Sequence, residues 1–482
     1  MPCRPTSSPR LGLRVRAASL ALALLASTHA WAQAVDEDAM FGGPEPADAP
    51  APATATTGPA DLTADSTQDE AGLFDRAAEG LSARMSARED FLDIGGLLYL
   101  RGSYSLVENV PGKHNALSTP SLVDLYADVR PTERVRAFVR GRVNHNFAVR
   151  DGSRDAYGNV QDKTTVQLDQ LWAKFDIART VYVTGGKQPL RWGSGRFWNP
   201  TDFVNTQVRD PLAAFDVRLG VGMLKLHLPV ESKNMNFYAI GTLDEANTPE
   251  EIGGALRGEF VLGTAELSLS AAARKDQPYI LGADISAGIW DFDLRLEGAV
   301  HYRDRGKYYT GTINPFTGEM PVLEDRSQDW IPQLVAGLDY AFNVGDNDSV
   351  SLGVEYFWNE SGYDGASIYP WLLAQGAFRP LYLGQHYGGA YVLAMGPGSW
   401  DDTTWIGSVL GNLSDKSYLA RLDFRATLLS YLSLDTYVNY HFGKSGEFHY
   451  GLSVPPIPGY LPKGIEINQP IADFGIGLRV AL

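Results

Sequence analysis

The sequence predicts an all-β chain that forms a transmembrane antiparallel β-barrel of about 18 strands (roughly 16 to 20). Three observations predict this fold. Apolar and polar residues alternate with a period of two over most of residues 91–482, and many of these runs last about ten residues. Short connections also alternate with long ones along the chain. Strands of this length can cross a bilayer when tilted, whereas those of a soluble sandwich would be shorter.

Composition excludes several other classes of protein. The 482 residues include 41 basic and 57 acidic side chains, which gives a net charge of −16. This acidic balance argues against a nucleic-acid partner. Away from the N-terminus, no apolar run reaches the roughly 18 residues that a membrane-spanning helix needs. Helical membrane proteins are therefore excluded, but barrel membrane proteins are not.

Residues 1–32 have the pattern of a Sec-type signal peptide. Arginines at positions 4, 10, 14 and 16 precede an apolar run over 17–26, and Ala30-Trp31-Ala32 supplies small residues at a cleavage site. The alternative is a short buried helix. The only cysteine, Cys3, lies in the segment that would be removed, so the exported chain would contain no thiol for metal binding or catalysis.

Two further segments precede the barrel. Residues 33–68 are rich in Ala, Pro, Thr, Asp and Gly, which predicts a disordered periplasmic linker. In residues 69–90, Leu73, Phe74, Ala77, Leu81 and Met85 recur at helical spacing. That segment is expected to be an amphipathic helix packed at the barrel entrance, an interfacial helix, a plug or a lead-in to the first strand.

Residues 91–482 are expected to form the barrel. The expected strands are 91–104, 121–129, 134–146, 164–176, 180–188, 214–228, 233–241, 252–262, 264–274, 280–288, 291–302, 332–342, 349–358, 386–396, 403–413, 417–428, 432–443 and 471–482. Connections after even-numbered strands are short, and those after odd-numbered strands are mostly long. This pattern is typical of outer-membrane barrels, with short periplasmic turns, long extracellular loops and both termini on the periplasmic side. The expected location is the outer membrane of a Gram-negative bacterium, where lipid and lipopolysaccharide would surround the chain.

Aromatic residues and the last strand agree with this location. Tyr340 and Phe342 close one expected strand at its short-turn end, while Tyr302 and Trp358 lie at long-loop ends, which are the two heights of an aromatic girdle. The chain ends in an alternating strand that resembles the C-terminal signal read by the barrel-assembly machinery of Gram-negative outer-membrane proteins. That family usually ends in Phe, and this chain ends in Leu482.

The long loop over 189–213 is the candidate constriction. It holds several aromatic rings and arginines that an exposed loop would rarely contain, so we expect it to fold inward; a rigid turn against the wall is the alternative. Asn199 and Asp202 of the Asn-Pro-Thr-Asp turn can bond nearby backbone N–H groups. The candidate residues are Arg191, Trp192, Arg196, Trp198, Asn199, Asp202 and Arg209.

This region also carries a resemblance to a known family. Residues 185–188 (GGKQ), 191–195 (RWGSG) and 199–202 (NPTD) resemble a stretch shared by porin-like Gram-negative barrels, some of which are similar to alginate-export proteins. The resemblance implies an eighteen-strand pore and does not identify a solute.

The third expected strand carries a row of arginines. Arg136, Arg140 and Arg142 share the parity opposite to the apolar one and are expected to face the lumen, with Arg134 at the turn. Permanent cations in a pore would attract carboxylate or phosphate groups. Alternatively, they pair with acids on the neighbouring strands, at positions 124, 128, 169 and 176.

The sequence thus predicts an outer-membrane channel for small solutes, including anionic ones, or an exporter of a polysaccharide. The alternative function is a non-transporting surface barrel that acts as an adhesin or envelope scaffold. No local motif supplies a nucleophile with a base, so no enzyme activity is expected. No metal or cofactor is expected either.

Overall fold

The structure is a computed structural model that describes residues 91–112, 116–154, 160–213, 217–313, 319–344, 348–454 and 465–482. The predicted signal peptide (1–32), linker (33–68) and helix (69–90) lie outside the described residues. Among the described residues, no helix is long and apolar enough to cross a membrane.

The barrel is a closed sheet of eighteen long strands. The two-residue β2 pairs with β1 and is the nineteenth strand of the same sheet. The long strands are β1 (Leu92–Val107), β3 (Pro120–Thr132), β4 (Val135–Asn146), β7 (Thr164–Ile177), β8 (Val181–Gln188), β9 (Val221–Val230), β10 (Met235–Thr242), β11 (Gly253–Leu262), β12 (Ala265–Ala273), β13 (Tyr279–Ile289), β14 (Phe292–Tyr302), β17 (Trp330–Val344), β18 (Asp348–Asn359), β19 (His386–Met395), β20 (Thr403–Asn412), β21 (Ser417–Leu429), β22 (Leu432–Gly443) and β25 (Pro470–Ala481).

Short elements lie in the connections between these strands. They are β2 (Leu117–Ser118), β5 (Ser153–Arg154), β6 (Val160–Gln161), η2 (Glu231–Lys233), η3 (Pro249–Glu251), β15 (Tyr308–Thr310), β16 (Val322–Glu324), η4 (Ala366–Ile368), α3 (Tyr369–Ala374), η5 (Glu447–His449), β23 (Leu452–Val454) and β24 (Ile465–Ile467).

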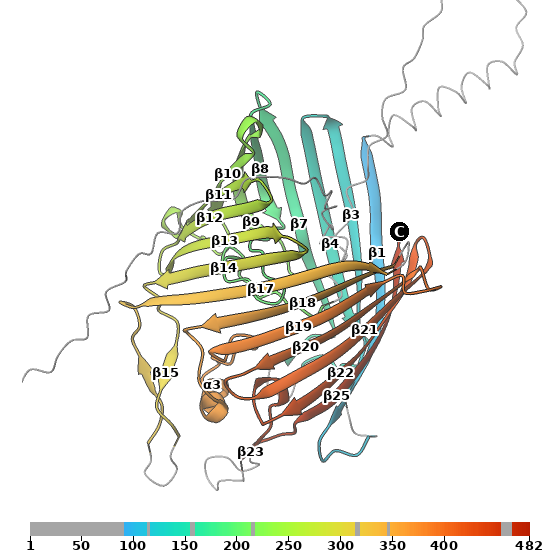
Figure 1. Cartoon of the computed structure of the whole chain (residues 1–482), viewed down its shortest axis with the longest axis vertical. Helices are drawn as coiled ribbons and strands as arrows, with labels where there is room; N and C mark the ends of the chain where they lie inside the picture. Colours follow the sequence, from blue (N-terminus) through green and yellow to red (C-terminus); the bar gives the residue numbers. More distant parts are fainter. Residues whose placement is uncertain are drawn as a thin grey trace, which may run out of the picture. The chain divides into compact units, whose positions relative to one another are not determined.

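The barrel closes because its first and last long strands pair. Each long strand pairs antiparallel with the next, and β25 pairs with β1 in a register that runs from Leu97 opposite Ala481 to Val107 opposite Pro470. Closure removes both sheet edges, so no long strand is left with a row of unpaired N–H and C=O groups. The ring of strands is visible in Figure 1.

All eighteen expected strands are present, and one boundary needs correction. The sixth expected strand, 214–228, begins only at Val221. Residues just before it belong to the preceding loop, because Arg218 forms an ion pair with Asp202 and the Gly220 N–H donates to the Asp169 carbonyl. These bonds to other elements replace strand pairing.

The two faces of each strand differ in chemistry as the alternation predicts. On β18, Leu352, Val354 and Tyr356 are exposed on the outside, whereas Gly353 and Glu355 between them are buried. The outside of the barrel is therefore apolar, and the inside carries polar side chains that are covered by segments within it.

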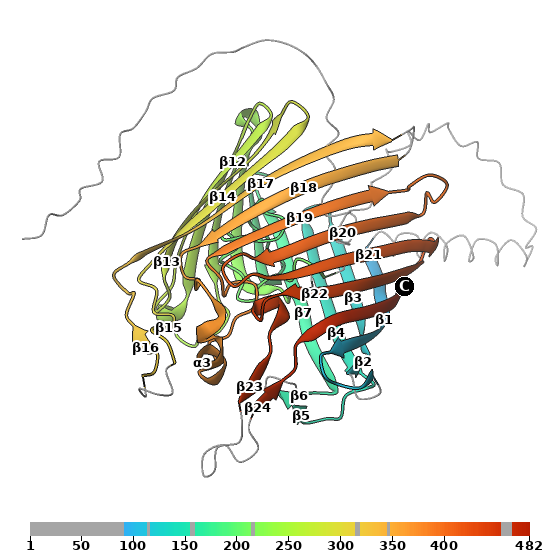
Figure 2. The ribbon, with the colours of Figure 1, turned by 60° about the horizontal axis from the view of Figure 1, so that its bottom comes forward.

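The connections divide by length between the two ends of the barrel. Turns such as 178–180 and 290–291 join strands at one end, where β1 begins and β25 ends. At the other end lie the long connections, and Figure 2 shows their elements β5, β15, α3 and β23 gathered there. We call these the short-turn end and the long-loop end.

Aromatic side chains mark both ends of the outer surface. Phe292 and Tyr340 lie opposite each other at the short-turn end of β14 and β17, and their ring centroids are 5.2 Å apart. At the long-loop end of the same strands, the rings of Tyr302 and Trp330 stack with centroids 4.6 Å apart. This arrangement is typical of a membrane-crossing barrel wall.

Candidate functional site

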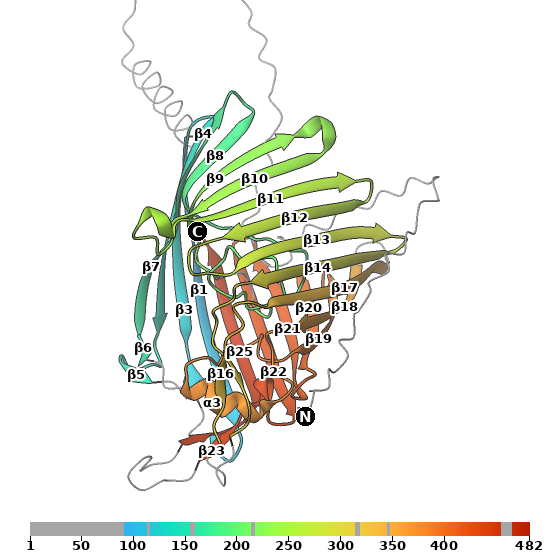
Figure 3. The same ribbon diagram turned by 90° about the vertical axis from the view of Figure 1, so that its left-hand side faces the viewer.

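The candidate site is the described part of the connection from β8 to β9, residues 189–213 and 217–220, which folds inside the barrel. Its contacts reach the inner faces of β14, β18 and β19, although β10, β11, β12 and β13 lie between β9 and β14 around the ring. In Figure 3 the green trace of this segment lies within the ring of strands. We call it the inward segment.

Glu297 on the inner face of β14 binds the first turn of the inward segment. Its Oε2 accepts from the backbone N–H groups of Ser194 (2.9 Å) and Gly195 (2.8 Å), and its Oε1 accepts from the N–H (2.8 Å) and hydroxyl (2.7 Å) of Thr201. A carboxylate that accepts several N–H bonds offsets the cost of its own burial. Gly193 adopts φ 92°, and a Cβ there would lie 2.5 Å from the Glu297 carboxylate.

Glu355 on β18 binds the following turn in the same way. Its Oε2 accepts from the Arg196 N–H at 2.6 Å, and its Oε1 accepts from the N–H groups of Phe197 (2.8 Å) and Trp198 (3.0 Å). Three successive backbone donors thus converge on one carboxylate. The two glutamates fix the backbone of the inward segment to the far wall.

Two tryptophans of the inward segment pack against opposite sides of the barrel interior. Trp198 is fully buried, and its ring lies 5.7 Å from that of Phe357 and 5.3 Å from that of Tyr387. Trp192 packs with Met223 and Ile240 on β9 and β10. Aromatic contacts of this kind add about 0.5–1.5 kcal/mol each beyond the area that they bury.

Asp202 ties the two halves of the inward segment together. Its carboxylate accepts from the Trp192 N–H at 3.1 Å, from the Asn205 side chain at 2.6 Å and from Arg218 at 2.7 Å. Burial raises the pKa of Asp202, while Arg218 and the Trp192 N–H act in the opposite direction. The expected backbone bond of the Asn-Pro-Thr-Asp turn is present through Asp202. Asn199 instead donates from its side chain to the Gly195 carbonyl at 2.6 Å.

The three candidate arginines of the inward segment differ in environment. Arg196 is buried, with its Nη1 donating to the Tyr391 hydroxyl at 2.9 Å and its guanidinium 3.8 Å from that ring's centroid. Arg209 donates to the Asn199 side-chain oxygen at 3.3 Å. Arg191 is exposed. Arg196 is therefore part of the packing, and Arg191 is the residue of this set that solvent reaches most freely.

The arginines of β4 face the lumen, and they and Arg134, which directly precedes β4, pair with neighbouring acids. Arg136 binds Asp128 at 2.8 Å, and Arg134 binds Asp176 at 2.8 Å. The remaining two, Arg140 and Arg142, share Asp169 at 3.8 and 3.2 Å, and Arg142 also binds Asp124 at 2.7 Å.

Arg142 needs correction as a pore-lining residue. Its side chain is only 4% exposed, and its Nη1 donates to the Val217 carbonyl of the inward segment at 2.7 Å. The inward segment covers this arginine. A solute therefore does not reach its guanidinium, and the local pairing that the sequence left open is the arrangement in the structure.

Two lysines that the sequence reasoning missed lie beside this row. In register across the wall, Arg136 is opposite Lys174, Lys174 is opposite Thr184, and Thr184 is opposite Lys225. Among the described residues, neither lysine makes a hydrogen bond or ion pair, and Lys174 lies 5.1 Å from the centroid of the Tyr182 ring. We call these four residues the basic arc. Both lysines follow the alternation, so their parity could have identified them.

The glutamates that hold the inward segment were also missed. Glu297 and Glu355 alternate with apolar neighbours, so the sequence places them on the lumen face. Nothing in the local sequence says which segment would occupy their carboxylates, since the bonded residues are about a hundred or more positions away.

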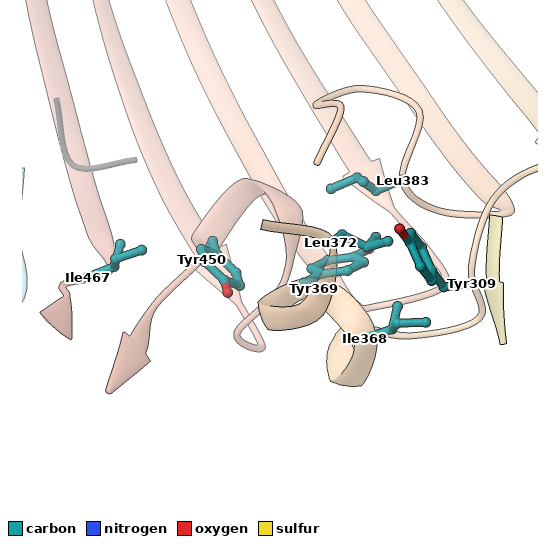
Figure 4. Packing of buried hydrophobic residues seen from close by; sticks show 7 residues of the cluster. All are labelled: Tyr309, Ile368, Tyr369, Leu372, Leu383, Tyr450 and Ile467. Carbon is teal, nitrogen blue, oxygen red and sulfur yellow. The ribbon is translucent and has the colours of Figure 1, made fainter. Parts of the chain in front are cut away.

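At the long-loop end, three connections pack on one another. Figure 4 shows the apolar cluster that they form, which consists of Tyr309, Ile368, Tyr369, Leu372, Leu383, Tyr450 and Ile467. Beside it, the carboxylate of Glu447 accepts from Tyr387 (2.5 Å), Asn412 (2.8 Å) and the Leu381 N–H. Burial raises the pKa of Glu447 to about 7. The Leu381 carbonyl in turn accepts from the Trp198 indole at 3.2 Å, which links these connections to the inward segment.

Within the described part of the chain, no group of three or more His, Cys, Asp or Glu side chains could hold a metal ion.

Comparisons with known proteins return structures but no family. No model of a known protein family matches the sequence, and no curated protein matches it. The resemblance to alginate-export barrels therefore stays a prediction.

Similar solved structures are outer-membrane proteins of Gram-negative bacteria. OccAB1 of Acinetobacter baumannii has 14% identity and a TM-score of 0.48, with 81% of this chain and 96% of that chain covered. OccK9 (OpdG) of Pseudomonas aeruginosa has 10% identity and a TM-score of 0.49, with 81% and 98% covered. OprB of Pseudomonas putida has 12% identity and a TM-score of 0.46, with 83% and 96% covered.

Proposed function

We propose that this protein is a channel of the Gram-negative outer membrane that passes small solutes through a constriction formed by the inward segment. The observation that carries this proposal is the attachment of that segment inside a closed 18-strand barrel by Glu297 and Glu355. A barrel of 16–18 strands leaves an aqueous interior. A segment held rigidly across that interior restricts what passes, whereas an adhesin or scaffold has no need of one.

Conductance in planar bilayers tests the proposal. The purified protein is expected to give discrete single-channel steps, and deletion of residues 190–206 is expected to increase the step size because it removes the constriction. Loss of those residues leaves the two glutamates facing water, which can solvate them, so the barrel should still assemble. A protein that inserts but gives no discrete channels would sink the channel proposal in favour of a surface scaffold.

The basic arc supports a preference for anionic solutes. Lys174 and Lys225 face the lumen on the short-turn side of the inward segment, since Lys225 is the next inward-facing residue of β9 after Met223, on which Trp192 packs. Like charges held near each other without an acid raise the local concentration of anions. Carboxylate- or phosphate-bearing solutes are the class that fits. Here the lysines, rather than the paired arginines of β4, supply positive charge without an acidic partner among the described residues.

Reversal potentials in a salt gradient test this preference. The double change Lys174→Ser and Lys225→Ser is expected to move the reversal potential toward cation selectivity. Arg140→Ser is the matched control for each single change, Lys174→Ser or Lys225→Ser, because each removes one positive charge and Arg140 lies at a paired position on the same wall. If the control moves the potential as much as the lysine changes do, charge count rather than accessibility sets the selectivity. Liposome swelling with a panel of sugars, organic acids and amino acids then identifies the solute class.

A further inference from the structure

A row of three aromatic rings lies on the outer surface at the long-loop end. Tyr279, Tyr302 and Trp330 are directly opposite one another on β13, β14 and β17. They face outward, since Tyr279 shares its parity with the exposed Leu281, and Tyr279 and Trp330 are 45% and 60% exposed. On a membrane-crossing wall, such a row marks the level of the lipid headgroups.

Arg303 lies on this row because of its backbone conformation. It directly follows β14, where continued alternation would turn it inward. Instead it adopts φ 60°, and its guanidinium carbon lies 5.5 Å from the centroid of Tyr279 and 5.9 Å from that of Tyr302. A left-handed conformation costs a non-glycine residue about 1–2 kcal/mol. The structure therefore places this cation on the outer aromatic surface at an energetic cost.

The charge of Arg303 has no counterpart in the described part of the chain. No hydrogen bond or ion pair there involves its guanidinium, and its side chain is exposed. Asp304, the next residue in the chain, accepts from the Gly306 N–H at 2.7 Å, and Asp276 binds Arg305 at 2.5 Å. The five N–H donors of Arg303 are free to bind an external anion.

An apolar hollow on the outer wall continues from the ring of Tyr279. It has a volume of about 630 Å³ and extends over β9 to β13. Small residues such as Ala239, Gly254 and Ala271 line it, and Leu256 and Leu281 lie among its larger lining residues. A cation on aromatic rings beside an apolar hollow has the two parts that an amphiphile with an anionic head requires.

We propose that Arg303, with the rings of Tyr279 and Tyr302, binds a phosphate of lipid A, the lipid expected at the long-loop end, and that one acyl chain of this lipid occupies the hollow. The inference rests on the proposed membrane location. The planar guanidinium matches two phosphate oxygens, and the rings hold it in place. Phosphatidylglycerol also carries a phosphate, so tighter binding of phosphatidylglycerol than of lipid A would overturn the proposal.

Titration of the detergent-purified protein with lipid, followed by native mass spectrometry, measures this binding. The lipids are lipid A, lipid A without its phosphates, and phosphatidylglycerol. Lipid A with phosphates is expected to bind at least tenfold more tightly than the phosphate-free form, and Arg303→Ala is expected to remove that difference. Arg305→Ala is the matched control, since this exposed arginine two residues away is already paired with Asp276. Equal binding by Arg303→Ala and the unchanged protein overturns the proposal.

A second variant tests the hollow. A Cβ at Gly254 would meet nothing within 4 Å, so Gly254→Leu fits the fold and fills the hollow. It is expected to weaken binding of lipid A, with or without its phosphates, severalfold. Gly407→Leu on β20 is equally uncrowded and lies away from the hollow, so binding should be unchanged. If Gly254→Leu binds like Gly407→Leu, the acyl chain lies elsewhere and the proposal fails.

The outcome is separable from that of the proposed function. Channel conductance of Arg303→Ala should equal that of the unchanged protein, because the residue lies on the outer surface. A barrel that conducts normally but does not distinguish phosphorylated lipid A refutes only the lipid site. A barrel that binds lipid but does not conduct refutes only the channel.

Discussion

Replacement of Glu355 by Gln should loosen the inward segment. The carboxylate receives three backbone N–H groups, with one oxygen accepting from Arg196 and the other from Phe197 and Trp198. A glutamine amide keeps one oxygen and turns an NH₂ group toward at least one of these donors. One hydrogen bond is therefore lost, and the others lose their ionic character.

The size of the effect follows from the bonds affected. A hydrogen bond to a charged group contributes about 1.5–3 kcal/mol and a neutral one about 0.5–1.5 kcal/mol. One bond lost and two weakened amount to roughly 3–6 kcal/mol, which relief of the buried charge reduces to about 3 kcal/mol. That value lowers the ratio of attached to detached segment about a hundredfold. Adding Glu297→Gln, which weakens the second attachment, should shift the ratio further.

Single-channel recording and limited proteolysis measure this change. Glu355→Gln is expected to show larger current fluctuations and faster cleavage within 189–220, and the double variant should approach the conductance of the 190–206 deletion. Glu360→Gln is the control. This glutamate lies just past β18, and its carboxylate makes a long ion pair of 3.8 Å with Arg326 instead of binding the inward segment. Unchanged noise, conductance and cleavage in the double variant would show that the carboxylates do not hold the segment.

Three other changes are expected to have measurable effects. Because burial raises the pKa of Glu447 from 4.5 to about 7, its contribution to docking of the β22–β25 connection is complete below about pH 4.5 and is lost as pH rises through about 7. Proteolysis of that connection should therefore accelerate between about pH 6 and 8, and Glu447→Gln should remove the pH dependence. Arg142→Ala leaves the buried Asp124 without its cation and Asp169 with only Arg140 at 3.8 Å, and it should destabilise the barrel by about 3–5 kcal/mol in urea titrations, whereas an equal midpoint would mean that water replaces the arginine. Trp198→Ala removes a fully buried ring and should cost about 3–5 kcal/mol of segment attachment, read as increased current noise; a quiet channel would contradict this.

Local sequence determined the strands and their faces. The period-two alternation identified all eighteen, because each strand separates an apolar exterior from a polar interior and a shift of one residue would exchange the faces. The boundary at Val221 was the exception, since residues 217–220 are held by Asp202 and Asp169 rather than by a neighbouring strand. Parity could also have placed Lys174 and Lys225 on the lumen wall, although their lack of acidic partners was visible only in the register.

For the candidate constriction, too, only some features could be predicted from the sequence. Its aromatic content and its turn residues predicted an inward fold, because rings such as Trp198 need a buried surface. Which wall receives it could not be predicted. Glu297 and Glu355 meet the segment only after the ring of strands has closed and brought β14 and β18 across from β8 and β9.

The sequence by itself thus determined the barrel, a strand number of about 18 and the alternating faces of the strands, because alternation and connection length are local properties. Only the tertiary structure decided which charges are neutralised and which remain accessible. Arg142 and Lys225 both face inward by parity, yet Arg142 lies between two aspartates under the inward segment while Lys225 has no acid opposite it. The difference arises from closure of the barrel, since pairing across strands and across the lumen depends on distances that the order of residues does not specify.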